Sequence, residues 1–315
     1  KWLWMVNGFV LSVLWPTIIR LLSESLPQKS LGTSSVIMGT TVAVGTFLIY
    51  GLSALYAALF KSFKPAFYTA AIAAVTVSVI WVIFYKKAVG MSKREKSLDI
   101  VTDGTKTEKG ESAVVDNKEK KLLFLTIGVL AFIAIGVNLV KDGLGTWVPK
   151  ILKDVFSMDD SLSILLTLFL PMVAILGNAF ALKIHKKIPD YVNQCGITFA
   201  LIAVLVCIII GLLEIKAAFL MLVLLILANF LASSLNSLIT SIFPMFMRGK
   251  VNSGMFAGIL NGFCYVGSTL SSSGLGMIAD KTGGWSAVFW TLATFSAAVC
   301  VVWAGYGITK KNIKN

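Results

Sequence analysis

The sequence predicts an all-α, polytopic membrane protein, and three observations lead to that fold class. The chain is 57% hydrophobic with a mean hydropathy of +0.85, which is too apolar for a water-soluble domain of this size. Nine apolar stretches are each long enough to cross a bilayer core, which is about 30 Å thick and needs about 20 helical residues. Because a backbone in lipid must satisfy its own hydrogen bonds, such stretches can only be helices. The loops between them divide the basic residues unequally.

The first helix has an unusual sequence near its middle. The nine helices are expected, in chain order, at residues 2–22, 34–59, 65–85, 122–146, 160–183, 195–213, 217–246, 253–279 and 286–307. The first contains Trp15-Pro16, and a proline inside a helix removes a backbone hydrogen bond and bends it. Membrane transporters use such broken helices near their binding sites, which makes Asn7 and Arg20 candidate solute contacts. In an alternative role, the Arg20 side chain extends to the lipid headgroups.

A polar segment separates the third expected helix from the fourth. Residues 86–121 contain ten Lys or Arg and seven Asp or Glu, are rich in Ser, Thr and Gly, and have almost no aromatic residues. Such a composition cannot bury enough apolar surface to fold alone, and it predicts a mobile linker. The expected domains are therefore a partial bundle of three helices at 1–85, the linker at 86–121, and a six-helix bundle at 122–315.

The basic residues predict the orientation in the membrane. When alternate loops are assigned to opposite sides, one side holds nineteen Lys or Arg and the other holds six. The positive-inside rule makes the first side cytoplasmic, so the linker and the C-terminus are expected in the cytoplasm. The expected location of the chain is the plasma membrane or the inner membrane of a cell. The net charge of +13 mostly expresses this rule, and no motif points to nucleic acid.

The fourth expected helix carries an adjacent pair of opposite charges, Lys141 and Asp142, inside an apolar stretch. An ionisable group at the bilayer centre costs about 3 kcal/mol, so such a group usually faces a wet cavity. Counted from Leu122 at about 1.5 Å per residue, however, Lys141 lies nearly at the far surface. Two interpretations therefore stay open: a cation in a cavity, or an interfacial lysine beside Trp147 as a membrane anchor.

The seventh and eighth helices have patterned polar and small residues. Asn229, Ser233, Asn236 and Thr240 recur at three- and four-residue steps and share one helix face, which lines either a cavity or a helix interface. The eighth helix carries a ridge of small residues, which permits close helix packing. That ridge contains Gly254, Gly258, Gly262, Gly267, Ser271 and Gly274.

The chain shows no motif of an enzyme. It contains no HExxH, GxSxG or P-loop pattern, so we expect neither catalysis nor ATP hydrolysis by the chain itself. Its four cysteines form no CxxC pair, and His185, the single histidine, stands beside two lysines at a helix end. We therefore expect no metal and no cofactor.

With these motifs, the chain resembles the major facilitator superfamily, and most closely the organophosphate:phosphate antiporters, which include sugar-phosphate permeases. Asn7-Gly8 through Trp15-Pro16 to Arg20 is similar to the fourth helix of those antiporters. Lys141-Asp142-Gly143-Leu144 with Trp147 and Pro149 resembles their seventh helix, and the glycine-rich segment ending at Gly276 to Asp280 resembles their eleventh. The chain departs from the pattern at Gly39 to Ala43, where some of the antiporters have a histidine.

The resemblance implies a secondary active transporter that works by alternating access. Its substrate would be a small, anionic solute such as a sugar phosphate or an organic acid, its surroundings the lipid bilayer, and its coupling ion H⁺ or phosphate. Lys141 corresponds to an antiporter arginine that grips phosphate, although a lysine lacks the planar guanidinium fork. The residues expected to contact the solute are Lys141, Asn138, Asn236, Asn261, Tyr265, Asn7 and Arg20.

Two other functions are compatible with the sequence. A proton-coupled permease or drug exporter of the same fold would use a titrating carboxylate, for which Asp142 is the candidate. A nontransporting membrane sensor on the same scaffold is the other alternative. The chain begins with Lys1 inside an apolar helix, and its second half has six helices against three in its first. From this asymmetry we expect an N-terminally truncated chain, which carries helices four to twelve of twelve.

Overall fold

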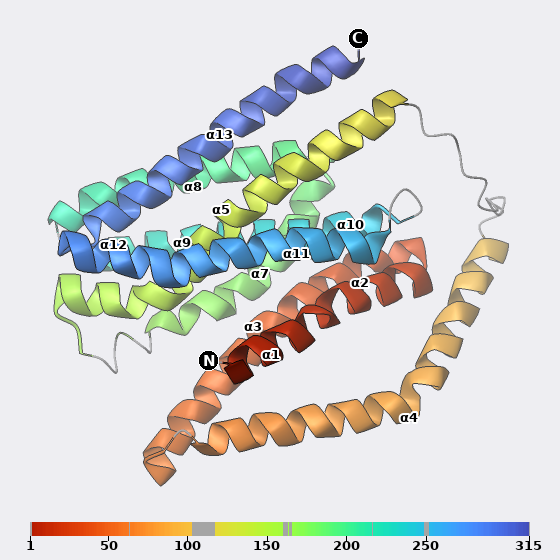
Figure 1. Ribbon diagram of the computed structural model, residues 1–315, viewed down its shortest axis with the longest axis horizontal. Helices are drawn as coiled ribbons and strands as arrows, with labels where there is room; N and C mark the ends of the chain where they lie inside the picture. The colour runs from red at the N-terminus through yellow and green to blue at the C-terminus, as the bar shows by residue number, and fades with distance from the viewer. Residues whose placement is uncertain are drawn as a thin grey trace.

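The computed structural model is helical over almost all of the chain that it describes, and it contains no strand there (Figure 1). It describes residues 2–62, 64–102, 117–159, 163, 166–215, 217–248 and 252–314. Nine helical rods follow one another in these ranges. The expected all-α fold class is therefore confirmed.

The rods begin and end as follows. They are α1 (Trp2–Ser12) with α2 (Leu14–Ser25), α3 (Gln28–Phe60), α4 (Lys64–Thr102), α5 (Asn117–Phe156), α7 (Phe169–His185), α8 (Tyr191–Ile215), α9 (Ala218–Ser237) with η1 (Leu238–Ile242) and α10 (Phe243–Phe246), α11 (Ser253–Thr269) with η2 (Leu270–Gly274) and α12 (Leu275–Thr282), and α13 (Ser286–Lys314). Of the described helices, seven are long and apolar enough to cross a membrane, while α7 is apolar but shorter. The rod of α11 and α12 is not among the seven, and it is the one rich in glycine and serine.

Several rods are longer than the apolar stretches that predict them. Helix α4 continues to Thr102 and α5 already begins at Asn117, so both ends of the expected linker are helical, and residues 103–116 lie outside the described part. Residues 86–102 contain no proline and several good helix formers, which explains the continuation beyond the apolar stretch. Helix α5 ends at Phe156, ten residues beyond the expected end at 146, and it includes Pro149.

The proline of the first rod divides it, as the sequence predicts. Pro16 has no N–H to donate to the carbonyl four residues earlier, and the helix is interrupted at Val13 between α1 and α2. The new helix α2 restarts with the Thr17 N–H donating to the Val13 carbonyl at 3.2 Å, and the Thr17 hydroxyl donates to the same oxygen.

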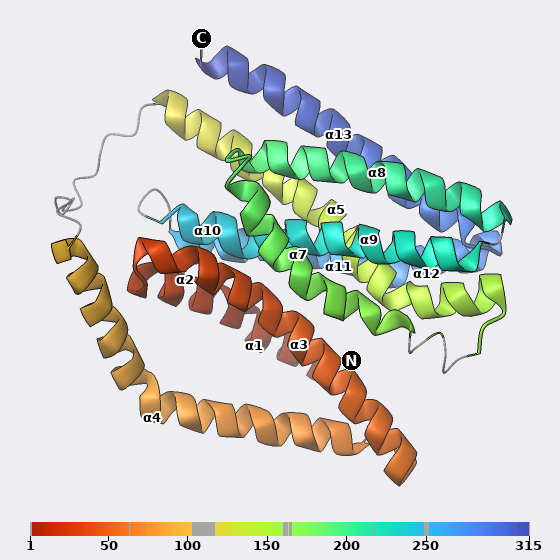
Figure 2. The ribbon, with the colours of Figure 1, turned by 180° about the vertical axis from the view of Figure 1, so that it is seen from behind.

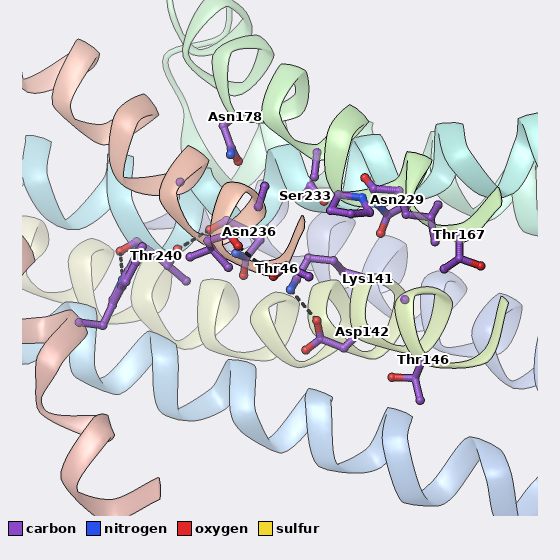
Figure 3. Close-up of a pocket in the computed structure, with 18 residues that line it drawn as sticks. Thr46, Lys141, Asp142, Thr146, Thr167, Asn178, Asn229, Ser233, Asn236 and Thr240 are labelled. Atoms are coloured by element: carbon purple, nitrogen blue, oxygen red, sulfur yellow. Dashed lines mark hydrogen bonds and ion pairs between the residues drawn. The ribbon is translucent and has the colours of Figure 1, made fainter. Parts of the chain in front are cut away.

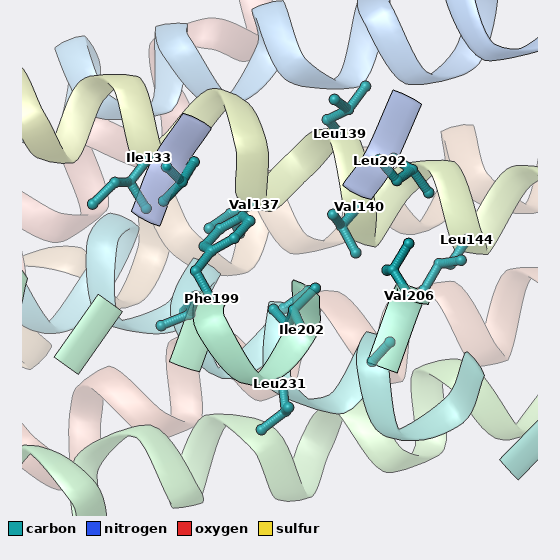
Figure 4. Close-up of a cluster of buried hydrophobic side chains, with 14 of the residues drawn as sticks. Ile133, Val137, Leu139, Val140, Leu144, Phe199, Ile202, Val206, Leu231 and Leu292 are labelled. Carbon is teal, nitrogen blue, oxygen red and sulfur yellow. The ribbon is translucent and has the colours of Figure 1, made fainter. Parts of the chain in front are cut away.

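The rods from α5 to α13 share one hydrophobic core (Figure 4). Side chains from α5, α8, α9 and α13 interdigitate there, and among them Ile133, Val137, Phe199 and Ile202 are fully buried. The helices come close where glycines replace larger residues. A Cβ at Gly267 on α11 would lie 2.2 Å from the Ile135 carbonyl oxygen on α5.

The first rods pack on this group through α2 and α3. Helix α3 runs along α7, and α2 runs along α11. A small core shared by the two groups contains Ile19, Leu31, Met245 and Ala257. Helix α4, by contrast, touches α3 and α2 at few points, and its stretch Lys64–Lys87 leaves its apolar side chains largely uncovered (Figures 1 and 2). A helix that is apolar and uncovered on nearly every side is suited to contact with lipid.

The two ends of the bundle are named here by one residue each. The Arg248 end holds the C-termini of α2 and α13 and the start of α5, and the Trp147 end holds the end of α5 and the start of α7 (Figures 1 and 2).

Candidate functional site

A polar cavity lies between the first rods and the group from α5 to α13. It has a larger compartment of about 360 Å³ and a smaller one of about 180 Å³. Both compartments are bordered by Trp15, Val42, Lys141, Asp142, Asn236 and Thr240. The larger one extends along α3, α7 and α9 toward Thr146 and Thr167, as Figure 3 shows. The smaller one lies against α5 and α11 and is also bordered by Asn138, Asn261, Cys264, Tyr265 and Ser268.

Lys141 and Asp142 lie on the wall that the compartments share (Figure 3). The Lys141 ammonium donates to Asp142 Oδ1 at 2.5 Å, and the Ser268 hydroxyl on α11 donates to Asp142 Oδ2. The carboxylate is thus held on both oxygens, while one of the three ammonium donors is used. The lysine side chain is 23% exposed and that exposure is toward the cavity.

The true length of α5 decides the depth of Lys141. The helix continues to Phe156, so about 22 Å of helix follows Lys141 on the side of the Trp147 end. Lys141 therefore lies well inside α5, with helix on both sides of it. The expected helix end at residue 146 was wrong, and the contact of Lys141 with the cavity supports the first interpretation, a cation in a cavity.

The polar face of α9 lines the larger compartment. All four residues of the predicted stripe, Asn229, Ser233, Asn236 and Thr240, border it. The Asn229 amide nitrogen donates to the Leu170 carbonyl on α7 at 3.1 Å. The Asn236 amide oxygen accepts from Asn138 on α5 at 3.3 Å, so the stripe is a cavity wall that also bonds two neighbouring helices.

Asn178 on α7 is a further cavity residue, 5% exposed and without a hydrogen-bond partner among the described residues. A Cβ at Gly39 on α3 would lie 2.8 Å from the Asn178 side chain. The glycine therefore gives Asn178 its room. Gly39, Val42 and Ala43 on α3 also border the cavity.

Trp15 closes the cavity toward the Arg248 end. Its indole N–H donates to the Thr240 carbonyl at 3.1 Å, across the two groups of rods. That carbonyl is available for a physical reason: Pro244, four residues later, has no N–H. Thr240 also lies in η1, a π-helical turn, a kind of turn found often at functional sites.

Three further contacts join the two groups of rods at the Arg248 end. Arg248 Nη1 donates to the Ser23 carbonyl at 2.9 Å and to the Leu26 carbonyl at 2.5 Å, at the end of α2. Burial lowers the pKa of this guanidinium from its ordinary value. Gly254 lies against Arg20, where an added Cβ would be 3.1 Å from the Arg20 Cβ. The Arg248 end of the cavity is thus closed by specific contacts.

The structure brings five of the seven expected site residues together. Lys141 and Asn236 border both compartments, and Asn138, Asn261 and Tyr265 border the smaller one. Asn7 and Arg20 border neither compartment. The Asn7 side chain is exposed on α1, which the break at Val13 separates from the cavity-lining part of the rod. Arg20 is exposed and pairs with Glu24 at 2.8 Å.

Sequence reasoning missed other residues that line the cavity. Asn178 was detectable, since a lone amide in an apolar membrane helix is a functional signal. Trp15 marks a kink and a family resemblance in the sequence, but neither predicts that its side chain borders the cavity. Ser268 and Thr46 carry no such signal, because a hydroxyl in a membrane helix usually bonds its own backbone, as Thr46 does with the Val42 carbonyl.

These features define a class of protein: a bundle of apolar helices in two groups that encloses a polar cavity with a charged pair. The family model of the Major Facilitator Superfamily matches residues 2–256, and the chain belongs to that family. No curated protein matches the sequence. The chain is therefore a multi-pass membrane protein and a secondary transporter of small-molecule solutes.

Proposed function

We propose that the chain transports a small anionic solute, such as a sugar phosphate or an organic acid, by alternating access. The observation that carries the proposal is the position of Lys141, a partly free ammonium in the middle of a membrane helix and on the wall of both compartments. A cation there is costly unless it serves a hydrated cavity or a ligand. The surrounding amides and hydroxyls suit the polar remainder of such a solute.

Lys141 has two donors left after its bond to Asp142. These can bind an oxyanion as a point charge, without the paired geometry of an arginine. The closed Arg248 end and the extension of the larger compartment toward the Trp147 end support access from one side at a time. We propose that the Arg248 end faces the cytoplasm, because its loops carry most of the basic residues.

Replacing Lys141 with Ala is expected to abolish uptake of the anionic solute, by about 100-fold or more in initial rate. The loss is large because the variant removes the cation and leaves the Asp142 carboxylate uncompensated beside the solute. The measurement is uptake of radiolabelled anions, phosphate esters and carboxylates, into cells that express the full chain.

The matched control is Lys150→Ala, nine residues later on the same helix. Lys150 lies outside the cavity, 3.6 Å from Asp280, and over the Trp147 and Trp285 rings. Its loss is expected to change uptake less than twofold, since exposed ion pairs contribute little. The double variant K141A/D142N removes both charges, and it is expected to show no more anion uptake than K141A because the cation is still missing. Equal uptake by K141A and K150A contradicts the proposal.

A proton-coupled permease is the second candidate, and the position of Asp142 favours it. Its carboxylate borders both compartments and holds Lys141, so a proton on Asp142 would release the ammonium. For this candidate, Asp142→Asn is expected to make uptake independent of an imposed proton gradient while solute binding persists. An exchanger of anions would show no such gradient dependence in the parent chain.

A further inference from the structure

Resting on the proposed function, a further inference concerns Asn138, which is 4% exposed on α5 and borders the smaller compartment. Its amide nitrogen donates to the Ala134 carbonyl at 3.2 Å and to Asn236 Oδ1 at 3.3 Å. The Ala134 carbonyl can only accept a hydrogen bond, so the Asn138 atom that faces it must be the nitrogen. The orientation of this buried amide is therefore fixed by the backbone of its own helix.

The orientation of Asn138 fixes that of Asn236 in turn. The donating nitrogen of Asn138 requires an acceptor, so the Asn236 oxygen must face it. The Cys264 thiol on α11 approaches the same oxygen at 3.9 Å, and a thiol is also a donor. Two helices thus hold the carbonyl side of the Asn236 amide, and its NH₂ side is left without a partner among the described residues. Asn236 borders both compartments beside Lys141.

We propose that Asn138 is a positioning residue that turns Asn236 into a hydrogen-bond donor, and that Asn236 and Lys141 together form the oxyanion end of the solute site. Without Asn138, the Asn236 amide could rotate by half a turn and offer its oxygen, which repels an anion. The selectivity of the cavity for anions then depends on the Asn138 amide, although Asn138 does not border the larger compartment.

The amide of Asn229, on the same face of α9, has the opposite orientation. Its nitrogen is bound to the Leu170 carbonyl, so its oxygen is the group left for the cavity. The two asparagines are seven residues apart, which is about 10 Å along the helix. The cavity therefore fits a solute with an oxyanion at one end and a hydrogen-bond donor, such as a hydroxyl group, at the other.

The test compares binding of an anion and of its neutral analogue by the purified full chain. The probes are 6-hydroxyhexanoate, its primary amide 6-hydroxyhexanamide, hexanoate and inorganic phosphate, and the readout is the dissociation constant from calorimetry. The parent is expected to prefer 6-hydroxyhexanoate over the amide, and Asn138→Ala is expected to reduce this preference about tenfold. Asn229→Leu is expected to remove the advantage of 6-hydroxyhexanoate over hexanoate and to leave phosphate binding unchanged.

Asn193→Ala is the matched control for loss of a bonded asparagine. Asn193 accepts a hydrogen bond from the Trp303 indole, outside the cavity, and its replacement is expected to leave the preference unchanged. If N138A weakens the anion and the amide equally, Asn138 is merely structural and the inference is overturned. If the parent binds none of the oxyanions, the proposed function fails as well, so the two failures are distinguishable.

Discussion

Gly267→Ala is expected to prevent most of the expressed molecules from folding stably. A Cβ at this position of α11 would lie 2.2 Å from the carbonyl oxygen of Ile135 and 3.0 Å from its carbonyl carbon. The obstacle is the backbone of α5 and not a mobile side-chain tip, so one of the two rods must move. Inserting a methyl group into such a contact costs about 3 kcal/mol or more. The measurement is the yield of monodisperse protein in detergent and its thermal unfolding midpoint.

Gly262→Ala is the matched control on the same helix. A Cβ at Gly262 would meet no atom within 4 Å, and alanine favours a helix over glycine by about 1 kcal/mol. We therefore expect G262A to have an unchanged or slightly higher unfolding midpoint. Equal midpoints for the two variants would show that α11 and α5 are not in close contact at Gly267.

The glycine ridge of α11 shows how far sequence reasoning reached. The spacing of Gly254, Gly258 and Gly262 predicts close packing, and the structure confirms it for the first two, which lie against α2. The spacing of the glycines does not reveal that Gly267, farther along the helix, faces α5 instead. The sequence gives the period of a helix, but which neighbour each face meets depends on the tertiary arrangement.

Some features of the candidate site were likewise predictable from the sequence, and others were not. The polar stripe on α9 was predictable, because amides are costly in lipid and their spacing places them on one face. The continuation of α5 beyond residue 146 was not, since the helix includes Pro149, a residue type that is usually unfavourable inside a helix. The orientation of the Asn236 amide was also beyond the sequence, because it depends on Asn138 and Cys264 from two other helices.

The second large effect concerns the contacts that hold the Arg248 end closed. The Arg248 guanidinium, on the connection between α10 and α11, donates to two carbonyls at the end of α2. Hydrogen bonds from a charged group contribute about 1.5–3 kcal/mol each. A transporter that opens alternately must break these bonds each time the Arg248 end opens. Arg248→Ala is therefore expected to shift the population toward the state open at this end.

The shift can be measured with a single cysteine at position 257. Ala257 is fully buried in the small core that α2 and α3 share with α10 and α11, so a cysteine there is protected while this end is closed. The four native cysteines are first replaced by serine; they are Cys195, Cys207, Cys264 and Cys300. R248A is expected to raise the rate of labelling by a membrane-impermeant thiol reagent, added at the Arg248 side, more than tenfold.

Two further variants separate closure from a general loss of stability. Lys310→Ala removes a cation at the same end, but Lys310 pairs with Asp190 inside the group from α5 to α13 and does not join it to α2. It is expected to leave the labelling rate unchanged. Arg248→Lys keeps the charge and enough donors on one nitrogen, but its side chain is shorter and reaches the two carbonyls less well, so an intermediate rate is expected. If K310A accelerates labelling as much as R248A, the Arg248 end loosens through unfolding, and the bonds to Ser23 and Leu26 do not control its opening.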